Sequence, residues 1–283
     1  MSVSPSSVRP DFTVTFWGVR GSIACPEPEM LRYGGNTSCL EVRCGEALLI
    51  FDAGTGLRPL GRKLALEGAI DADLFLSHTH FDHVSGLPFF GPVFVPHNRF
   101  RFWAGHLETQ GLELCDVLCE LMMPPLFPVL IEIFKADIAY KDFQAGQTLT
   151  PRPGVVLRTA PLNHPNGATG YRIEYGGKTI CYVTDTEHDG LGPDPRITGL
   201  IAGADLVIYD STYTDEEYPQ FKGWGHSTWE EGIRVCEAAG AKRLVIFHHD
   251  PSHDDRIMDG IAEAAEKRRP GTLVAREGMT LTP

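Results

Sequence analysis

Short apolar runs alternate with stretches of helical periodicity along most of the chain. In the first third, runs rich in β-branched and aromatic residues predict strands, and an amphipathic stretch predicts a helix. A hairpin turn is expected at residues 44–46, where a glycine separates two such runs. The expected strands are Thr13–Trp17, Ser38–Arg43, Ala47–Phe51 and Leu74–Ser77, and the expected helix is Leu57–Glu67.

The second half repeats this alternation of strand and helix patterns. Five strands are predicted, at Val155–Ala160, Gly170–Tyr175, Thr179–Thr184, Leu206–Tyr209 and Leu244–Phe247. Two helices are predicted, at Thr228–Ala239 and Asp254–Lys267, and Gly240 gives the first of them a natural end. Both halves therefore predict sheets covered by helices, an α/β (α+β) fold.

Two segments depart from this pattern. Residues 1–10 are rich in serine and proline and are expected to form a loose tail before a single domain of residues 11–283. Residues 100–145 are expected to be an insertion beside the active site, with a helix over Glu108–Met123 and then a proline-rich apolar stretch. Such a segment would serve as a lid or as a contact in a homodimer.

Composition restricts the classes of function. The formal net charge of −12 is a poor match for general nucleic-acid binding, which needs a basic surface. Seven scattered cysteines without a CxxC pair suggest reduced thiols and a cytoplasmic protein. No apolar run approaches the length of a membrane span, and the N-terminus lacks the apolar core of a signal peptide. No membrane partner is expected.

The strongest chemical signal is the hexapeptide of residues 78–83, His-Thr-His-Phe-Asp-His, directly after an apolar strand. Residues two apart on an extended segment point the same way, so His78 and His80 are placed to bind one ion. A turn after Phe81 would direct Asp82 and His83 to a second ion. Imidazole and carboxylate ligands suit zinc, manganese or iron.

Four more polar residues stand at predicted strand ends or in loops: His164, Asp185, His226 and His248. Side chains at the ends of neighbouring strands converge, because adjacent strands lie close together. His249 follows His248 directly, so either of them could be the ligand. The strand register favours His248, which leaves His249 to support the site from outside or to contact substrate.

This order of motifs resembles the metallo-β-lactamase superfamily. The resemblance implies a four-layer αβ/βα sandwich of two facing mixed β-sheets, with two divalent metal ions, most readily zinc, at one edge. It also implies the ligand roles. The first metal would be held by His78, His80 and His164, the second by Asp82, His83 and His248, with Asp185 as the bridge and Asp52 as a support behind them.

Further motifs resemble the tRNase Z-like phosphodiesterase branch, including its small bacterial members. The residues Gly225-His226-Ser227-Thr228 match its histidine motif, and His164 precedes a Gly-Tyr strand by a similar gap. The protruding arm that tRNase Z enzymes use to grip tRNA has no counterpart among the insertions of this chain. There is thus no strong case for a nucleic-acid partner.

His226 has two readings. Hydrolysis of a phosphodiester needs an acid for the leaving oxygen, and a histidine outside the metal ligands suits that role. Alternatively, His226 only accompanies the cap of the following helix. Under the first reading, His226, Asp82 and Asp185 are the expected catalytic residues.

Substrate contacts are less constrained. Asn36 and Thr37 would either donate to a phosphate or shape a turn. Phe127 and Trp224 would either stack on a base or pack in the core.

The prediction is a dinuclear hydrolase acting on a small nucleotide-like or cyclic nucleotide diester, with a metal-bridging hydroxide as nucleophile and His226 as general acid. The alternatives are a thioesterase like glyoxalase II or a lactonase on the same scaffold, and a metal-bound protein without enzymatic activity.

Overall fold

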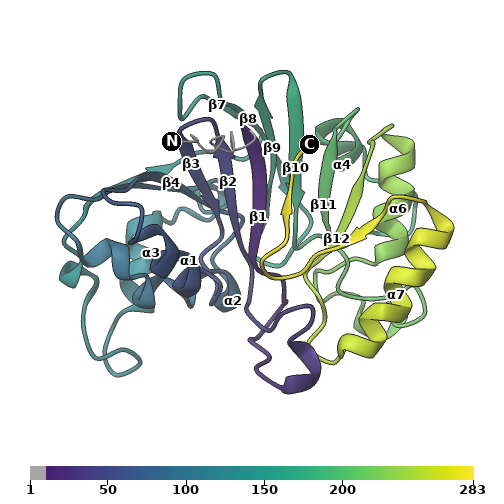
Figure 1. Cartoon of the computed structure of the whole chain (residues 1–283), viewed down its shortest axis with the longest axis horizontal. Coiled ribbons are helices and arrows are strands. Elements are labelled where there is room, and N and C mark those ends of the chain that lie inside the picture. Colours follow the sequence, from purple (N-terminus) through teal and green to yellow (C-terminus); the bar gives the residue numbers. More distant parts are fainter. Residues whose placement is uncertain (1–10) are drawn as a thin grey trace, which may run out of the picture.

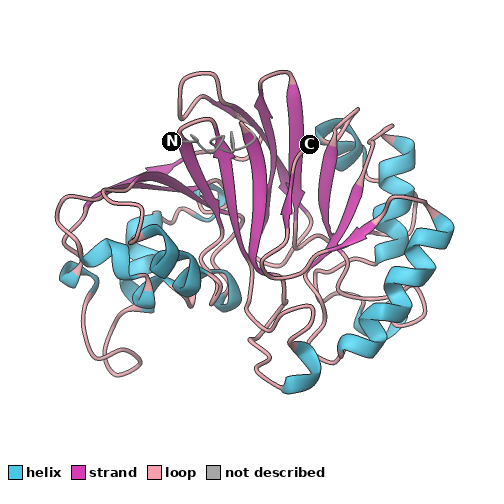
Figure 2. Cartoon of the chain, viewed as in Figure 1, coloured by secondary structure: helices cyan, strands magenta, loops and turns pink. Residues whose placement is uncertain are grey.

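The computed structural model describes residues 11–283, and the expected tail at residues 1–10 lies outside them. Two seven-stranded β-sheets face each other in the centre of the molecule, and helices cover the outer face of each sheet (Figures 1 and 2). The two halves of the sandwich follow each other in the sequence, except that the last strand returns to the first sheet. The predicted αβ/βα fold is confirmed.

The first sheet has the order β14-β1-β2-β3-β4-β5-β6. Strands β14 to β3 pair antiparallel, and β3 to β6 pair parallel. The strands are β1 (Phe12–Gly18), β2 (Cys39–Cys44), β3 (Ala47–Phe51), β4 (Asp71–Leu76), β5 (Arg99–Ala104), β6 (Asp137–Asp142) and β14 (Thr280–Leu281).

The second sheet has the order β13-β12-β11-β10-β9-β8-β7. Strands β10 to β13 pair parallel, and β7 to β10 pair antiparallel. The strands are β7 (Thr148–Leu149), β8 (Val156–Leu162), β9 (Ala168–Tyr175), β10 (Lys178–Val183), β11 (Leu206–Asp210), β12 (Leu244–Phe247) and β13 (Leu273–Val274).

Seven α-helices and five short 3₁₀ turns complete the described chain. The helices are α1 (Leu57–Leu64), α2 (Phe81–Val84), α3 (Leu114–Leu121), α4 (Pro195–Leu200), α5 (Tyr218–Phe221), α6 (Trp229–Ala238) and α7 (Asp255–Arg268). The 3₁₀ turns are Pro28–Met30, Leu87–Phe89, Gly91–Phe94, Glu108–Gln110 and Ile131–Ile133. Among residues 11–283, no helix combines the length and the apolar character needed to cross a bilayer.

Alternation along the strands builds three layers of core. In β3, Leu48 and Ile50 pack outward beneath α1, whereas Leu49 and Phe51 point between the sheets. The layer between the sheets is rich in aromatic rings; Phe51, for example, stacks on Phe75 with ring centroids 5.3 Å apart. The layer between the sheets is therefore mainly apolar and aromatic.

The segment at 100–145 differs from the expected insertion. Its two ends, β5 and β6, are strands of the first sheet, paired parallel with β4 and with each other. Strand β6 is an edge strand whose residues are exposed or half-buried, so it lacks the apolar run that marks a central strand. The helix expected over Glu108–Met123 is shorter, because Gly111 adopts a positive φ of 68° and separates a 3₁₀ turn from α3.

Candidate metal centre and active site

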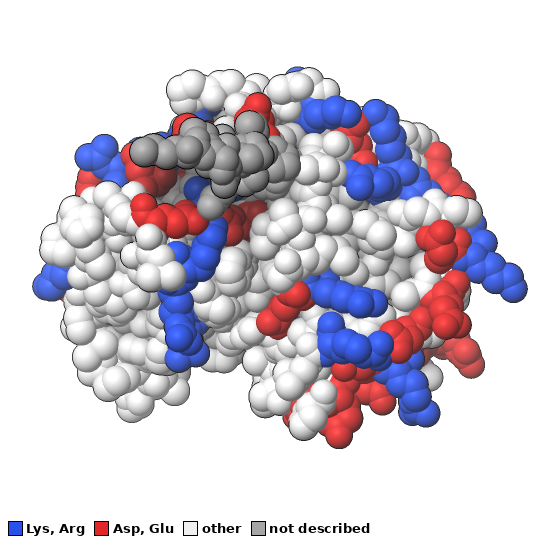
Figure 3. All heavy atoms as spheres, viewed as in Figure 1, with Lys and Arg blue, Asp and Glu red and all other residues white. Residues whose placement is uncertain are grey.

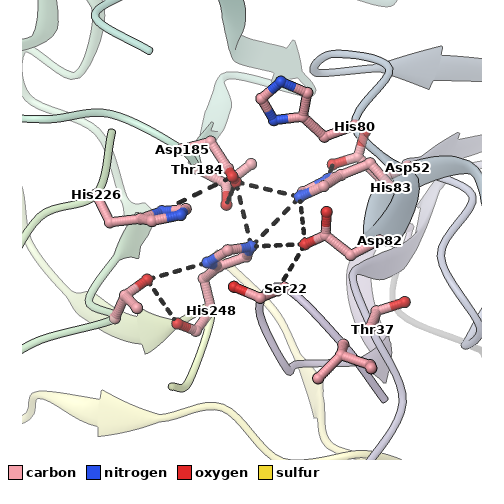
Figure 4. A network of polar contacts seen from close by, with 12 residues as sticks. Ser22, Thr37, Asp52, His80, Asp82, His83, Thr184, Asp185, His226 and His248 are labelled. Atoms are coloured by element: carbon pink, nitrogen blue, oxygen red, sulfur yellow. Dashed lines mark hydrogen bonds and ion pairs between the residues drawn. The ribbon is translucent and has the colours of Figure 1, made fainter. Parts of the chain in front are cut away.

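Six strands end at one edge of the sandwich, and each delivers a polar residue there. The parallel segments of both sheets run toward this edge, so their carboxyl ends meet across the gap between the sheets. The residues at or just after the strand ends are Asp52 (β3), His78 (β4), His164 (β8), Asp185 (β10), Asp210 (β11) and His248 (β12). Helix α2 adds Asp82 and His83. Figure 4 shows the side chains of Asp82, His83, Asp185 and His248 pointing toward one another.

Four of these side chains form a tight, buried cluster. Nε2 of His83 lies 3.3 Å from Nε2 of His248 and 3.3 Å from both Asp82 Oδ2 and Asp185 Oδ1. Nε2 of His248 lies 3.4 Å from Asp82 Oδ2 and 3.3 Å from Asp185 Oδ1. Ligand atoms held tetrahedrally at about 2.0–2.1 Å from one ion lie about 3.4 Å apart. The spacing therefore fits one divalent cation.

The second oxygen of Asp185 faces another group of histidines. Oδ2 lies 3.7 Å from Nε2 of His78 and 3.7 Å from Nε2 of His164, and Nδ1 of His80 lies 3.0 Å from that same His164 atom. Nε2 of His78 is buried and has no hydrogen-bond partner among residues 11–283. A buried polar atom without a partner is costly, and a metal ion would satisfy it. Asp185 thus connects the two groups with one oxygen each.

The ring nitrogens that point away from the cluster are also engaged. Nδ1 of His83 lies 2.8 Å from Asp52 Oδ2, and Asp52 also accepts hydrogen bonds from Ser77 and from Tyr182. Such contacts fix the tautomer and orientation of imidazole ligands. The corresponding contacts of the other rings are His78 with Ser77, His80 with Asn166, His164 with the Gly225 carbonyl and His248 with Thr212.

Unusual backbone geometry concentrates at the same place. Positive φ angles are rare for residues other than glycine, and they cluster at functional sites. Among residues 11–283, the non-glycine residues with positive φ are Ser22, Asp52, Asn166, Asp185 and His248. All five belong to the centre or contact it; the Ser22 amide, for instance, donates to Asp82 Oδ2 over 2.8 Å. The fold holds strained backbone where it aims these side chains.

Both carboxylates of the cluster stay ionised although they are buried. Burial raises the pKa of Asp82, but the charge of the His83 ring and hydrogen bonds from His248 and His83 outweigh it and hold that pKa well below its usual value. The same balance lowers the pKa of Asp185. Buried negative charge surrounded by imidazoles is the environment that a divalent cation stabilises.

A carboxylate that the sequence did not reveal as functional lies beside His226. Asp210 Oδ2 is 3.2 Å from Nδ1 of His226, while Asp185 Oδ2 is 3.8 Å from the same atom. Burial lowers the pKa of His226, but Asp210 and Asp185 more than compensate and raise it to about 9. Asp210 is the last residue of a fully buried strand. A carboxylate at the end of an apolar strand was the sequence feature that could have marked it as functional.

The comparisons with known proteins agree with this geometry. A family model described as the Beta-lactamase superfamily domain matches residues 48–249, a span that includes every residue from His78 to His248. The chain belongs to the metallo-β-lactamase superfamily. As a member of this superfamily, it is a metal-dependent hydrolase.

Sequence relatives match most of the length of this superfamily member. Ribonuclease Z of Myxococcus xanthus is 24% identical, covering 87% of this chain and 92% of its own. Ribonuclease Z of Parabacteroides distasonis is 28% identical, covering 84% and 90%. The expected resemblance to the tRNase Z-like branch is confirmed.

Solved structures support the fold. The metallo-β-lactamase fold protein YhfI from Bacillus subtilis superposes with a TM-score of 0.72 at 20% identity and covers 95% of this chain and 98% of its own. A diphosphatase from the PhnP family gives a TM-score of 0.67 at 19% identity, with 96% and 98% covered.

The histidine pair at 248–249 is divided between two environments. His248 lies in the cluster, and the absence of a side chain at Gly21 makes room for it, because a Cβ there would lie 2.5 Å from the His248 ring. His249 points away; its Nε2 lies 2.9 Å from the carbonyl of Ala275, and its backbone pairs with residues 19 and 21. His249 therefore supports the loop that carries Ser22 and takes no part in the cluster.

The residues expected to contact substrate differ in their surroundings. Asn36 donates to Glu277, and the Thr37 hydroxyl accepts from the Thr55 amide, so both shape the loop after β1. Phe127 is half-buried beside Phe89. Trp224 remains 64% exposed, two residues before His226. Phe81, which the sequence did not mark as a contact, is 71% exposed between His80 and Asp82.

Proposed function

We propose that this chain hydrolyses a phosphodiester with two divalent ions, zinc in the first instance. The proposed ligands are His78, His80, Asp82, His83, His164, Asp185 and His248. The observation that carries the proposal is the Asp210–His226 pair, which stands beside the cluster without being needed to complete either group of ligands. Divalent ions in such a centre activate water and neutralise charge on the phosphoryl oxygens. The protein must still supply a proton for the leaving oxygen.

His226 is arranged for that proton transfer. With Nδ1–H donated to Asp210, the other nitrogen, Nε2, is the atom that gives the proton to the leaving oxygen. Asp210 stays oriented because it accepts hydrogen bonds from the amides of Thr186 and Thr212. The pair thus resembles a general acid with its orienting carboxylate.

The alternative reading, in which His226 only accompanies the cap of helix α6, matches the position of the cap but does not account for the contact between the His226 ring and Asp210. The N-cap is Thr228, whose hydroxyl oxygen accepts from the Glu231 amide over 3.0 Å. Two acidic residues, Glu230 and Glu231, already occupy the first turn. The cap does not use the His226 ring, whose Nδ1 lies against Asp210 instead.

We propose a small nucleotide-like diester as the substrate class, with Trp224 and Phe81 as exposed rings beside the centre that would stack on a base. A second candidate is RNA, because the relatives in the comparison are named ribonuclease Z. Those relatives weaken the argument from net charge against a nucleic-acid partner. Hydrolysis of a thioester or a lactone would not explain why His226 is paired with Asp210 beside the cluster.

A dimer stays a prediction. The lobe over α3 presents few charged side chains in Figure 3, and several apolar residues of its proline-rich segment are exposed. These are Met123, Leu126, Leu130 and Ile133.

Replacement of His226 by alanine tests the proposal. Turnover of bis(p-nitrophenyl) phosphate, of a cyclic nucleotide and of a short RNA should be compared with hydrolysis of S-lactoylglutathione and an acyl-homoserine lactone. We expect activity on at least one phosphodiester, reduced roughly 10²- to 10⁴-fold in His226→Ala with metal content unchanged. Activity confined to the thioester or the lactone, or loss of metal in the variant, would contradict the proposal.

A further inference from the structure

The loop that carries His226 contains two glycines in the left-handed region of the backbone. Gly223 and Gly225 both have positive φ, 93° and 89°, which favours glycine. A Cβ at Gly225 would lie 2.3 Å from Nδ1 of His164, so the loop passes close to a metal-ligand candidate. The Gly225 carbonyl accepts from that same Nδ1 over 2.7 Å. The position of this loop therefore affects His164 on one side and His226 on the other.

Glu187 supplies the support. One carboxylate oxygen accepts from the amide of Gly223 at 2.9 Å, and the other accepts from the amides of Gly223 and Gly225, each at 2.8 Å. The hydroxyl of Tyr218 approaches the first oxygen at 3.4 Å. A carboxylate is an unusually good partner here, because hydrogen bonds to a charged acceptor are roughly twice as strong as neutral ones.

The backbone of Glu187 is fixed as well. Its amide donates to the carbonyl of Asn163 over 2.7 Å, and its carbonyl accepts from the Asn163 side chain over 2.8 Å. Asn163 directly precedes His164, and Glu187 follows Asp185 by two residues. Glu187 thus joins three segments: the turn at 163–165, the loop after β10 and the glycine loop.

We propose that Glu187 is a positioning residue for His226: its carboxylate holds the glycine loop so that the imidazole reaches the leaving oxygen. This inference rests on the proposed function, in which His226 supplies the proton. It makes a distinct claim, because Glu187 contacts neither Asp210 nor the ring of His226 among the described residues. The carboxylate acts through the backbone at 223–225.

The test compares Glu187→Gln with wild type on two matched substrates, methyl phenyl phosphate and methyl p-nitrophenyl phosphate. Phenolate is the poorer leaving group and needs the acid more than p-nitrophenolate does. Glutamine keeps the shape of the side chain but has only one acceptor oxygen. In the wild type, the two oxygens of Glu187 together accept from the amides of Gly223 and Gly225. We expect kcat for the phenyl ester to fall roughly 10- to 100-fold, and for the p-nitrophenyl ester less than about 3-fold, with metal content unchanged.

Asp189→Asn is the matched control. Asp189 lies on the same loop, and its carboxylate accepts only from the nearby Leu191 amide in the described chain. It should leave both rates near wild type.

A double variant separates this inference from the proposed function. In a His226→Ala background, Glu187→Gln should cause no further loss on the phenyl ester, because the group that Glu187 positions is absent. Equal losses on both esters, multiplicative losses in the double variant, or loss of bound metal would overturn the positioning role. If His226→Ala alone has no effect on the phenyl ester, the proposed function fails first.

Discussion

The carboxylate of Asp52 lies 2.8 Å from Nδ1 of His83, on the side of the ring away from the cluster. Neither residue is exposed, and the same carboxylate accepts hydrogen bonds from Ser77 and Tyr182. Asp52 connects the end of β3 to helix α2 and, through Tyr182, to the opposite sheet. This contact therefore ties the metal centre to the sandwich that carries it.

Replacement of Asp52 by asparagine should weaken metal binding. An amide cannot provide the negative charge that supports His83 as a ligand, and loss of such outer contacts typically lowers metal affinity about 10- to 100-fold. Zinc affinity should be measured by competition with a chromogenic chelator. Asp205→Asn is the control. Asp205 lies just before β11, at the end of that strand away from the metal centre, and pairs with Lys242. Equal affinity in wild type and Asp52→Asn would show that His83 is not held this way.

Replacement of Asp210 by asparagine should change the pH dependence of turnover. His226 acts while protonated, so activity is present below its pKa and is lost as pH rises through it. Asp210 contributes to raising that pKa to about 9, and without its charge the alkaline limb should move to lower pH. Cations at Asp82 and Asp185 would lower the pKa of His226 in both the wild type and the variant, and the variant would still lose activity at the lower pH. The profile of kcat against pH checks this, and a limb that does not move excludes His226 as the acid.

Glu230 should make stability depend on pH away from the metal centre. Burial raises the pKa of its carboxyl to about 7. The folded state therefore binds this proton more tightly than the unfolded state, so its contribution is complete below the unfolded pKa near 4.5 and is lost as pH rises through 7.

Glu230→Gln removes that titration while keeping an acceptor for the Asp215 amide. The free energy of unfolding of the variant, relative to wild type, should increase by about 1–2 kcal/mol between pH 5 and pH 8, less than the full shift implies because water screens the site. Urea denaturation at the two pH values measures this difference. The same difference at both pH values would mean that Glu230 titrates normally.

Trp224 should contribute to binding of an aromatic substrate. Its ring is exposed and packs edge-on against Phe221 beside the His226 loop. Stacking on a base is worth about 1–3 kcal/mol, so Trp224→Ala should raise KM at least about 5-fold for a nucleotide diester and leave methyl phosphodiesters unaffected. Leu66→Ala, an apolar change at an exposed position just after α1, serves as the control. Identical KM effects on both substrates would exclude stacking.

Much of the fold and the ligand set could be predicted from the sequence because their signals are local. The run from His78 to His83 is contiguous, and the central strands are uninterrupted apolar runs. Strand β6 gave no such signal, since it is stabilised by parallel pairing with β5 rather than by its own residues. The register of such pairing between strands far apart in the sequence is set only in the folded chain, so the sequence of β6 alone does not reveal it.

The residues that sequence reasoning missed share one property: they act through contacts between distant segments. Asn166 faces His80 across 86 positions, and Glu187 reaches Gly223 across 36. Asp210 looks like any polar residue after a buried strand until His226 is placed next to it. Positive φ angles at Ser22 and Asn166 could not be inferred, because only the tertiary structure imposes them.

The central claim is that one carboxylate, Asp185, joins two groups of ligands around two cations. Elemental analysis of the purified protein, with Asp185→Ala beside it, tests this most directly. The account predicts two divalent transition-metal ions per wild-type chain, and at most one in the variant, with phosphodiesterase activity lost. A wild-type chain that binds no such ion from zinc-supplemented buffer, or a variant that retains both ions, would contradict it.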